Sequence, residues 1–233
     1  MPLKGICIGN GLTEPEEQYD RYADVALDGC LEKGAIANPL AHAAMKAAVG
    51  TCVNQIHSCS ANETDACTTA YATCCYVELI PHQLTGYSPY GVRIKCAVSP
   101  FCYDFSNVGT FLNARATQQQ LGVNAKRGSC NLVANIAFQH GWMLKFHTEI
   151  PFVLGDGVKV SVYAGGVDYV CNWLGNKKWT LALEWPRKAE FNTAANAAYS
   201  LNGKPVGRLH SSNGFTSRRC SWLATWCPWT SRL

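Results

Sequence analysis

Residues 158–173 read Val158-Lys159-Val160-Ser161-Val162-Tyr163-Ala164-Gly165-Gly166-Val167-Asp168-Tyr169-Val170-Cys171-Asn172-Trp173. The β-branched and apolar residues of 158–164 predict a buried strand that the two glycines end. An acid follows at Asp168, and residues 173–179 favour a helix. Strand, glycine turn, acid and helix in this order are typical of an open α/β sheet, where sites lie beyond the carboxyl ends of strands. Asp168 is therefore a candidate functional residue, although an acid here is more often a helix cap or a solvated loop residue.

Length, composition and charge set broad limits on the function. The 233 residues are 48% apolar and 15% charged, which permits a sizeable core and argues against a disordered chain. No apolar run approaches the ~18 residues of a membrane span, and residues 1–8 lack the features of a signal peptide. The net charge of +4 comes from 20 basic and 16 acidic residues. Because no basic stripe is present, nucleic acid is not an expected partner.

The cysteines point to an oxidising compartment. Thirteen cysteines are many for a cytosolic protein of this size. No Cys-x-x-Cys pair occurs, and His42, His57 and His82 show no metal-like pattern with nearby acids, so neither a metal nor a cofactor is expected. Free, buried cysteines remain the alternative to disulfides.

A helical hairpin explains the cysteine spacing. Residues 38–59 predict a helix opened by Asn38 and Pro39, and residues 65–80 tolerate a second helix. Cysteines seven residues apart share one helix face, because seven residues make two turns. An antiparallel hairpin then brings two pairs into register and leaves Cys75 about 100° away, unpaired, since successive helical residues are ~100° apart. The predicted disulfides are Cys52–Cys74, Cys59–Cys67 and, closing a short loop over Pro100, Cys96–Cys102.

Other elements follow from local signals. A short strand is expected at 3–8, ended by the turn Gly9-Asn10-Gly11. Residues 188–216 are expected to form strands with a turn at Asn202-Gly203. Further helices are predicted at 16–31, within 105–121 with Ser106 or Asn107 as the cap, and at 131–147.

The stretch from Tyr163 to Asn176 resembles a motif of the serine carboxypeptidases, which use the α/β-hydrolase fold. That family carries Tyr-Ala-Gly-Asp-x-Asp-x-Ile-Cys-Asn-Trp-x-Gly-Asn here, and its second acid, the triad aspartate, matches Asp168. The first acid is Gly166 in this chain. Cys171 matches a free cysteine that lines the family's substrate site, although a small buried residue is an equal alternative.

The resemblance runs from about residue 3 to 216. Residues 4–13 resemble the strand and turn that follow the nucleophile, residues 95–106 resemble a short disulfide loop, and the hairpin resembles the family's inserted helical cap. It implies an α/β fold, a partial α/β-hydrolase sheet with an inserted disulfide-bonded helical cap. The implied units are partial core at 1–29, cap at 30–104, the C-terminal half of the core at 105–216 and an aberrant tail at 217–233.

Two parts of the family's triad are missing from this sequence. No serine stands in Gly-x-Ser-x-Gly, which predicts a C-terminal fragment that begins inside the hydrolase domain. The family's Gly-His-Met-Val-Pro-x-Asp-Gln is also absent. If the reading frame is shifted by one nucleotide, the codons for residues 224–231 can encode that motif. In the shifted frame the codons of Trp226-Cys227 must encode the valine of the motif, and those of Trp229-Thr230 must encode its aspartate. We therefore expect a shifted reading frame in the tail.

The implied function is hydrolysis of C-terminal peptide bonds by a Ser-Asp-His triad acting on peptides. With only Asp168 of the triad, the chain alone is expected to be inactive. The family implies a lysosomal, vacuolar or secreted protein, and Asn62-Glu63-Thr64 is a glycosylation sequon. Cys7, Cys30, Cys130 and the tail cysteines would stay unpaired.

Two other function classes remain open. One is a non-catalytic cap or binding module stabilised by disulfides. The other is a cysteine hydrolase with Cys171 as the nucleophile and His140, His147 or His210 as the base.

Overall fold

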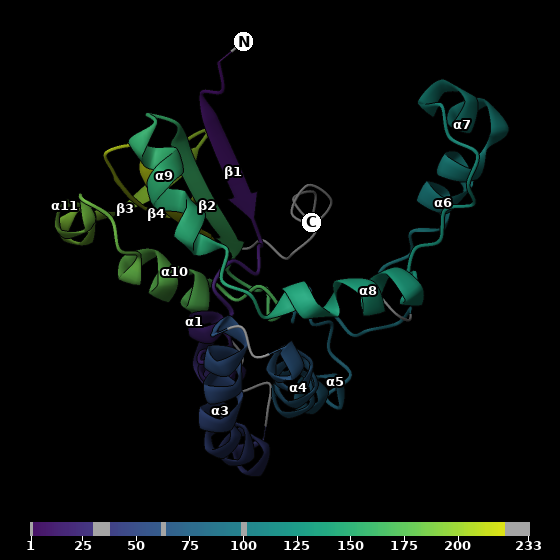
Figure 1. The fold of residues 1–233 in the computed structure, drawn as a ribbon, viewed down its shortest axis with the longest axis horizontal. Helices are drawn as coiled ribbons and strands as arrows, with labels where there is room; N and C mark the ends of the chain where they lie inside the picture. Colours follow the sequence, from purple (N-terminus) through teal and green to yellow (C-terminus); the bar gives the residue numbers. More distant parts are fainter. Residues whose placement is uncertain (1, 30–37, 62–63, 99–101, 222–233) are drawn as a thin grey trace.

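The computed structural model describes residues 2–29, 38–61, 64–98 and 102–221 (Figure 1). Within them a mixed five-stranded sheet has the order β1-β2-β5-β4-β3. The first three strands of this order are parallel, and β4 and β3 complete the sheet as antiparallel hairpins. β1 and β3 are thus its two edges. The strands are β1 (Gly5–Gly9), β2 (Lys159–Gly165), β3 (Asn196–Leu201), β4 (Lys204–Ser212) and β5 (Phe215–Cys220).

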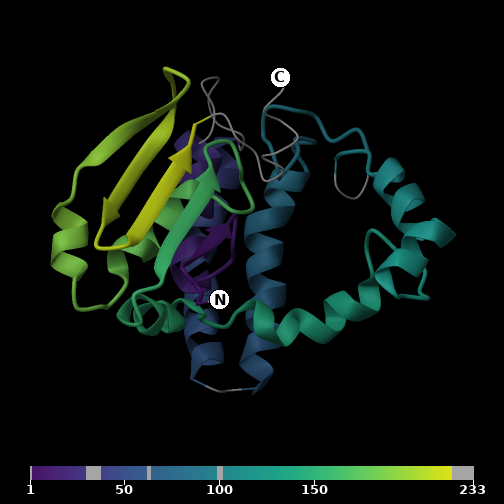
Figure 2. The same cartoon turned by 90° about the horizontal axis from the view of Figure 1, so that it is seen from above.

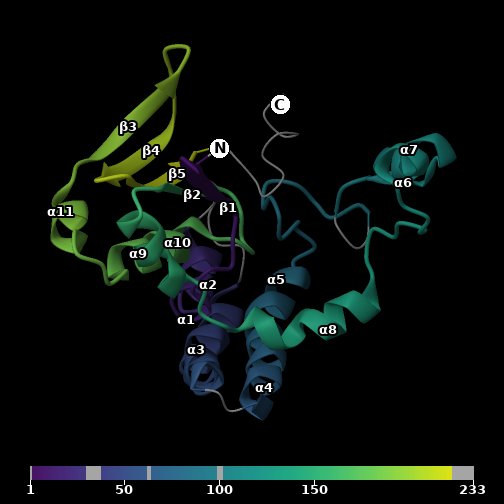
Figure 3. The same ribbon diagram turned by 45° about the horizontal axis from the view of Figure 1, so that its top comes forward.

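Three helices cover one side of the sheet, as Figure 3 shows. They are α9 (Ile150–Gly155), α10 (Trp173–Ala182) and α11 (Lys188–Thr193), and a single 3₁₀ turn (His147–Glu149) precedes α9. Trp179 of α10, Phe191 of α11 and Phe215 of β5 are at most 1% exposed and form the centre of this core. Burying three aromatic side chains contributes several kcal/mol, at roughly 2 kcal/mol for each.

A helical unit stands beside the sheet. Its hairpin consists of α3 (Pro39–Ser60) and α4 (Thr64–Cys74), which run side by side in Figure 2. Asn38 caps α3 by accepting from the backbone N–H of Ala41 at 2.8 Å. The structure has disulfides at the three pairs that the hairpin register and the short loop predict, Cys52–Cys74, Cys59–Cys67 and Cys96–Cys102. Free cysteines are Cys7, Cys75, Cys130, Cys171 and Cys220 among the described residues, whereas Cys30 and Cys227 lie outside them.

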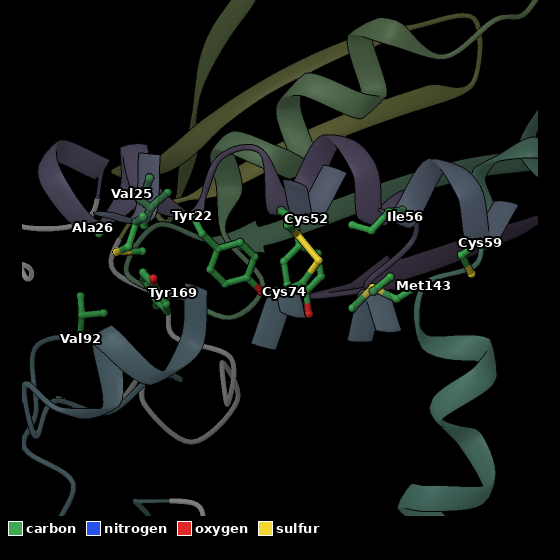
Figure 4. Close-up of a cluster of buried hydrophobic side chains, with 14 of the residues drawn as sticks. Tyr22, Val25, Ala26, Cys52, Ile56, Cys59, Cys74, Val92, Met143 and Tyr169 are labelled. Atoms are coloured by element: carbon green, nitrogen blue, oxygen red, sulfur yellow. A yellow bond between two sulfur atoms is a disulfide. The ribbon is translucent and has the colours of Figure 1, made fainter. Parts of the chain in front are cut away.

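The hairpin shares its core with the chain that enters and leaves the sheet (Figure 4). Tyr22 and Tyr169 meet edge to face, with ring centroids 5.1 Å apart, in the same buried cluster as Cys52 and Cys74. This contact joins residues that are far apart in sequence. The helical unit is completed by α1 (Pro15–Tyr19), α2 (Tyr22–Asp24), a π-turn (Val25–Gly29), a second π-turn (Cys75–Leu79) and α5 (Ile80–Gln83).

A helical arm begins against α4, where Trp142 meets Tyr71 edge to face, and extends away from the sheet in Figures 1 and 2. It consists of α6 (Ser106–Asn113), α7 (Arg115–Leu121) and α8 (Leu132–Trp142). Among the described residues, no helix is long and apolar enough to cross a bilayer.

Besides the helix expected at 131–147, which ends at Trp142, three predicted elements differ in the structure. The helix expected at 16–31 is broken after Tyr19 and continues as α2 and a π-turn that bury Tyr22, Val25 and Ala26, and its residues 30–31 lie outside the described ones. The helix expected within 105–121 is two helices, because Ala114 is extended (ψ 133°). Neither Ser106 nor Asn107 caps it: the carboxylate of Asp104 accepts from the Ser106 N–H at 2.8 Å instead.

The third difference lies in the segment that was expected to be all strand. Residues 188–193 form α11, because this turn buries Phe191 against Phe215 (ring centroids 4.8 Å apart) while Lys188 pairs with Glu184 at 2.5 Å, four residues earlier. The turn at Asn202-Gly203 is present, with φ values of 52° and 76°, as a type I′ hairpin requires. β5 continues to Cys220, four residues beyond the expected end of the core at 216.

Candidate active site

Asp168 lies at the carboxyl end of β2, in the turn between this strand and α10. Its side chain is fully buried (0% exposed). Its carboxylate Oδ1 accepts from the backbone N–H of Cys171 at 2.9 Å, and its own N–H donates to the Gly165 carbonyl at 3.3 Å. The acid is thus held in place by its own loop, beyond the carboxyl end of a strand, where functional sites of open α/β sheets are found.

The helical unit holds this loop from the other side. The N–H groups of Tyr169 and Val170 both donate to the Pro89 carbonyl at 3.1 Å, and the Tyr22 hydroxyl donates to the Val170 carbonyl. The Tyr169 hydroxyl in turn donates to the Glu78 carbonyl at 2.7 Å. Four hydrogen bonds between distant segments therefore restrict the backbone beside Asp168.

The start of α10 explains the rest of the motif. Asn172 is the N-cap, because its side-chain Oδ1 accepts from the Gly175 N–H at 2.7 Å. Asn176 donates back to the Asn172 carbonyl at 3.0 Å. A Cβ atom on Gly175 would lie 2.6 Å from the Cα of Gln18, so only glycine lets α10 pack against α1 this closely.

Strands β1 and β5 flank the glycine turn that precedes Asp168. Asn10 has a left-handed backbone (φ 49°), and its side-chain oxygen accepts from the Gly165 N–H at 3.1 Å. The Gly166 N–H donates to the Cys220 carbonyl at 2.7 Å. The chain therefore leaves β5 directly beside the Asp168 loop. An acid at position 166, as in the family motif, would place its Cβ 3.0 Å from the Cys220 carbonyl oxygen.

The surroundings of Asp168 are largely apolar and aromatic. Burial raises the pKa of the Tyr22, Tyr90 and Tyr103 hydroxyls, and the nearby carboxylate of Asp168 adds to each shift. These phenols stay neutral and can donate hydrogen bonds. Burial also raises the pKa of the Cys171 thiol well above its ordinary value, and Asp168 raises it further.

The neutral thiol argues against a cysteine hydrolase, because the thiolate is the nucleophile. No hydrogen bond joins Cys171 to a histidine within the described residues. His210 contacts the Phe191 carbonyl below α11, and His147 has its pKa lowered by burial in another part of the molecule. The side chain of His140 lies outside the described part of the structure.

Several residues that hold the site were not among the predicted ones. Asn10 carried a turn signal within Gly9-Asn10-Gly11, but its bond to Gly165 spans 155 positions. Gln18 and Pro89 belong to no sequence pattern that would predict a contact with the Asp168 loop or with α10. No group of three or more potential metal ligands occurs in the described residues. Asn62, the predicted glycosylation site, lies outside them.

The chain matches known proteins over nearly its whole length. The profile of the family "Serine carboxypeptidase" (Peptidase_S10) matches residues 1–220. Serine carboxypeptidase-like 48 of Arabidopsis thaliana is 39% identical over 218 residues, which cover 92% of this chain and 42% of the relative. Carboxypeptidase Y homolog A of Sclerotinia sclerotiorum is 38% identical over 226 residues, which cover 93% of this chain and 41% of the relative. The chain thus spans less than half the length of these two relatives.

A solved structure shows the same fold. It is that of Kex1(delta)p, a prohormone-processing carboxypeptidase from Saccharomyces cerevisiae, with a TM-score of 0.69 and 18% sequence identity. The match covers 97% of this chain and 51% of the yeast protein. The predicted fold class, a partial α/β-hydrolase sheet with a disulfide-bonded helical cap, agrees with this likeness. By its sequence profile and its relatives, the chain belongs to the serine carboxypeptidase family.

Proposed function

We propose that this chain provides the aspartate-bearing part of a serine carboxypeptidase, which hydrolyses C-terminal peptide bonds with a Ser-Asp-His triad. The supporting observation is the placement of Asp168, a fully buried carboxylate at the carboxyl end of a sheet strand. The chain that leaves β5 passes next to its loop, where a histidine could reach it.

In such a triad the serine attacks the peptide carbonyl and the histidine accepts its proton. The aspartate holds the imidazole in the required tautomer and stabilises the imidazolium that forms. Asp168 suits this role because its loop is anchored by the hydrogen bonds to Pro89 and Cys171. Cys171 would line the substrate site as a neutral thiol. Peptides are the proposed substrates, and the proposed location is lysosomal, vacuolar or secreted.

An aspartate without its two partners cannot catalyse the reaction. No serine in residues 1–233 has glycine at both −2 and +2, and the family's histidine motif is absent. We expect the purified chain to release no amino acid from an N-acylated dipeptide. Release that survives removal of contaminating peptidases would contradict this part of the proposal.

A graft tests the role of Asp168 directly. Residues 3–220 of this chain would replace the matching segment of the Arabidopsis relative, whose remaining parts supply a serine and a histidine. We expect the graft to hydrolyse N-acylated dipeptides, and Asp168→Asn to lower kcat by about 10⁴-fold with little change in KM.

The matched control is Asp156→Asn, which makes the same change at an exposed acid after α9. It should leave kcat and KM unchanged. If Asp168→Asn retains kcat within about tenfold of the parent graft, far less than removal of a triad aspartate costs, Asp168 does not orient the base.

A further inference from the structure

A basic pocket lies between α10 and the sheet. It encloses about 110 Å³, several times the ~30 Å³ that a water molecule occupies in the liquid. No acidic side chain lines it in the described part of the chain. Residues of four elements line it, among them Trp173 and Lys177 of α10, Asn196 of β3, Arg208 and His210 of β4, and Ser217 and Arg219 of β5.

The two arginines lie directly opposite each other in the sheet. Arg208 is paired with Arg219 in the antiparallel ladder of β4 and β5, so both side chains leave the same face. Residues paired in this way have Cβ atoms ~5 Å apart, and like charges at this spacing are destabilising. An anion that contacts both guanidinium groups would replace this repulsion by attraction.

The pocket's cations are held for such a contact. Arg219 stacks on Trp173, with its guanidinium carbon 4.0 Å from the ring centroid, which fixes the plane of its N–H donors. Arg208 donates to the Asn196 carbonyl, and neither Arg208 nor Lys177 forms an ion pair with a carboxylate within the described residues. The positive charges of Arg208, Arg219 and Lys177 therefore converge on the pocket. Within the described residues, Arg208 and Lys177 have no acidic partner.

A hydroxyl group also lines the pocket. Thr180 donates its hydroxyl hydrogen to the Lys177 carbonyl at 2.9 Å, so the Ser217 hydroxyl, 3.2 Å away, donates to the Thr180 oxygen. Ser217 and Arg219 are two residues apart on β5 and share the face that carries Arg208. The pocket thus combines guanidinium and ammonium donors around one small volume.

We infer that this pocket binds a divalent tetrahedral oxyanion, a phosphate or sulfate group. Planar guanidinium groups match the paired oxygens of such anions with two parallel N–H donors, and a lysine adds a mobile point charge. The inference does not rest on the proposed peptidase function, because its argument uses no residue of the proposed triad.

The test is a titration of the full chain with inorganic phosphate, followed by calorimetry and thermal unfolding, at an ionic strength kept constant with sodium chloride. Inorganic sulfate is the second arm. We expect either anion to bind and to raise Tm. Arg208→Gln should weaken binding about tenfold, which corresponds to loss of one charge-assisted hydrogen-bond pair, and Lys177→Gln should weaken it less.

The control is Lys204→Gln, which removes an exposed cation from the same strand β4 outside the pocket. It should leave binding unchanged. Without phosphate, Arg208→Gln should leave Tm near that of the parent, because it removes the repulsion from Arg219 as well as the hydrogen bond to the Asn196 carbonyl. Arg208→Lys, which keeps the charge, provides a folded variant with weakened binding. Binding that is equal in Arg208→Gln and Lys204→Gln, or a Tm rise that sodium chloride reproduces, would overturn the inference.

Discussion

Position 175 has no room for a side chain. A Cβ atom there would lie 2.6 Å from the Cα of Gln18, and backbone cannot move aside as a flexible side chain can. We expect Gly175→Ala to lower the free energy of unfolding by about 1–3 kcal/mol, the usual cost of overpacking, in urea titrations. Gly50 in α3 is the control, because a Cβ there meets nothing within 4 Å. Gly50→Ala should raise stability by up to about 1 kcal/mol; equal effects at the two glycines would contradict the steric explanation.

Glu78 and His82 place polar atoms in the core beneath Tyr169. Both side chains are almost fully buried, and neither carboxylate oxygen nor ring nitrogen has a hydrogen-bond partner within the described residues. Burial raises the pKa of Glu78 to about 8 and lowers that of His82 to about 4. Lys46 opposes the Glu78 shift, whereas Asp20 and Asp24 add to it. Both groups are therefore neutral in the folded protein between these two values.

These shifts predict how stability depends on pH. Between pH 4.5 and 6.5, the ordinary values, folded Glu78 keeps a proton that it loses on unfolding, while His82 gains one on unfolding, so the two slopes cancel. Above pH 6.5 only Glu78 acts, and stability should fall by about 2 kcal/mol up to pH 8. Glu78→Gln should abolish this fall in urea titrations, and Glu184→Gln, an exposed acid, should not. A fall that persists in Glu78→Gln would argue against burial as its cause.

At the scale of elements, the α3–α4 hairpin depends on its nested disulfides. The Cys52–Cys74 bond closes a loop with a sequence separation of 22, around the separation of 8 closed by Cys59–Cys67. We expect the double substitution Cys52→Ser and Cys74→Ser to lower the free energy of unfolding by about 3 kcal/mol. Cys75→Ser, at a free cysteine on the same segment, is the control and should cost less. Similar losses in both variants would show that packing, rather than the bond, stabilises the hairpin.

Local chemistry explains which elements could be predicted. The cysteine spacing alone defined the hairpin register, and Asn202-Gly203 defined a turn, because each depends on residues close in sequence. Packing between distant segments determines three other features: the break after Tyr19, the helix at 188–193 and the hydrogen bond from Gly165 to Asn10. A second left-handed turn lies at Asn213-Gly214 (φ 49° and 84°). It has the same Asn-Gly sequence as the turn at Asn202-Gly203, but it is not among the predicted turns.

The candidate site follows the same division. Asp168 was found because it stands in a sequence motif whose asparagines and glycine build the start of α10. Its support from Pro89 and Tyr22, and the facing arginines of the pocket, result from strand pairing and tertiary contacts. Such arrangements have no fixed sequence spacing, so no pattern along the chain predicts them.

At the scale of the whole molecule, α8 exposes a large apolar surface. Leu132, Val133, Ile136 and Phe138 are 71%, 78%, 57% and 75% exposed, which is more than isolated surface residues contribute. We expect the dye ANS to bind this helix, and the double substitution Val133→Ser and Phe138→Ser to reduce its fluorescence. Gln119→Ser on α7 is the control. Unchanged fluorescence in the double variant would place the dye elsewhere.

The position of β1 at one border of the sheet and β3 at the other has a consequence at high protein concentration. Prolines and charged residues on edge strands usually prevent pairing with a strand of another molecule. β1 contains neither from Gly5 to Gly9. If β1 of one molecule pairs with β3 of the next, the contact joins two different edge strands. The pair of molecules then still has one unpaired β1 and one unpaired β3, to which further copies can add. Assembly of this kind produces filaments of indefinite length instead of closed dimers.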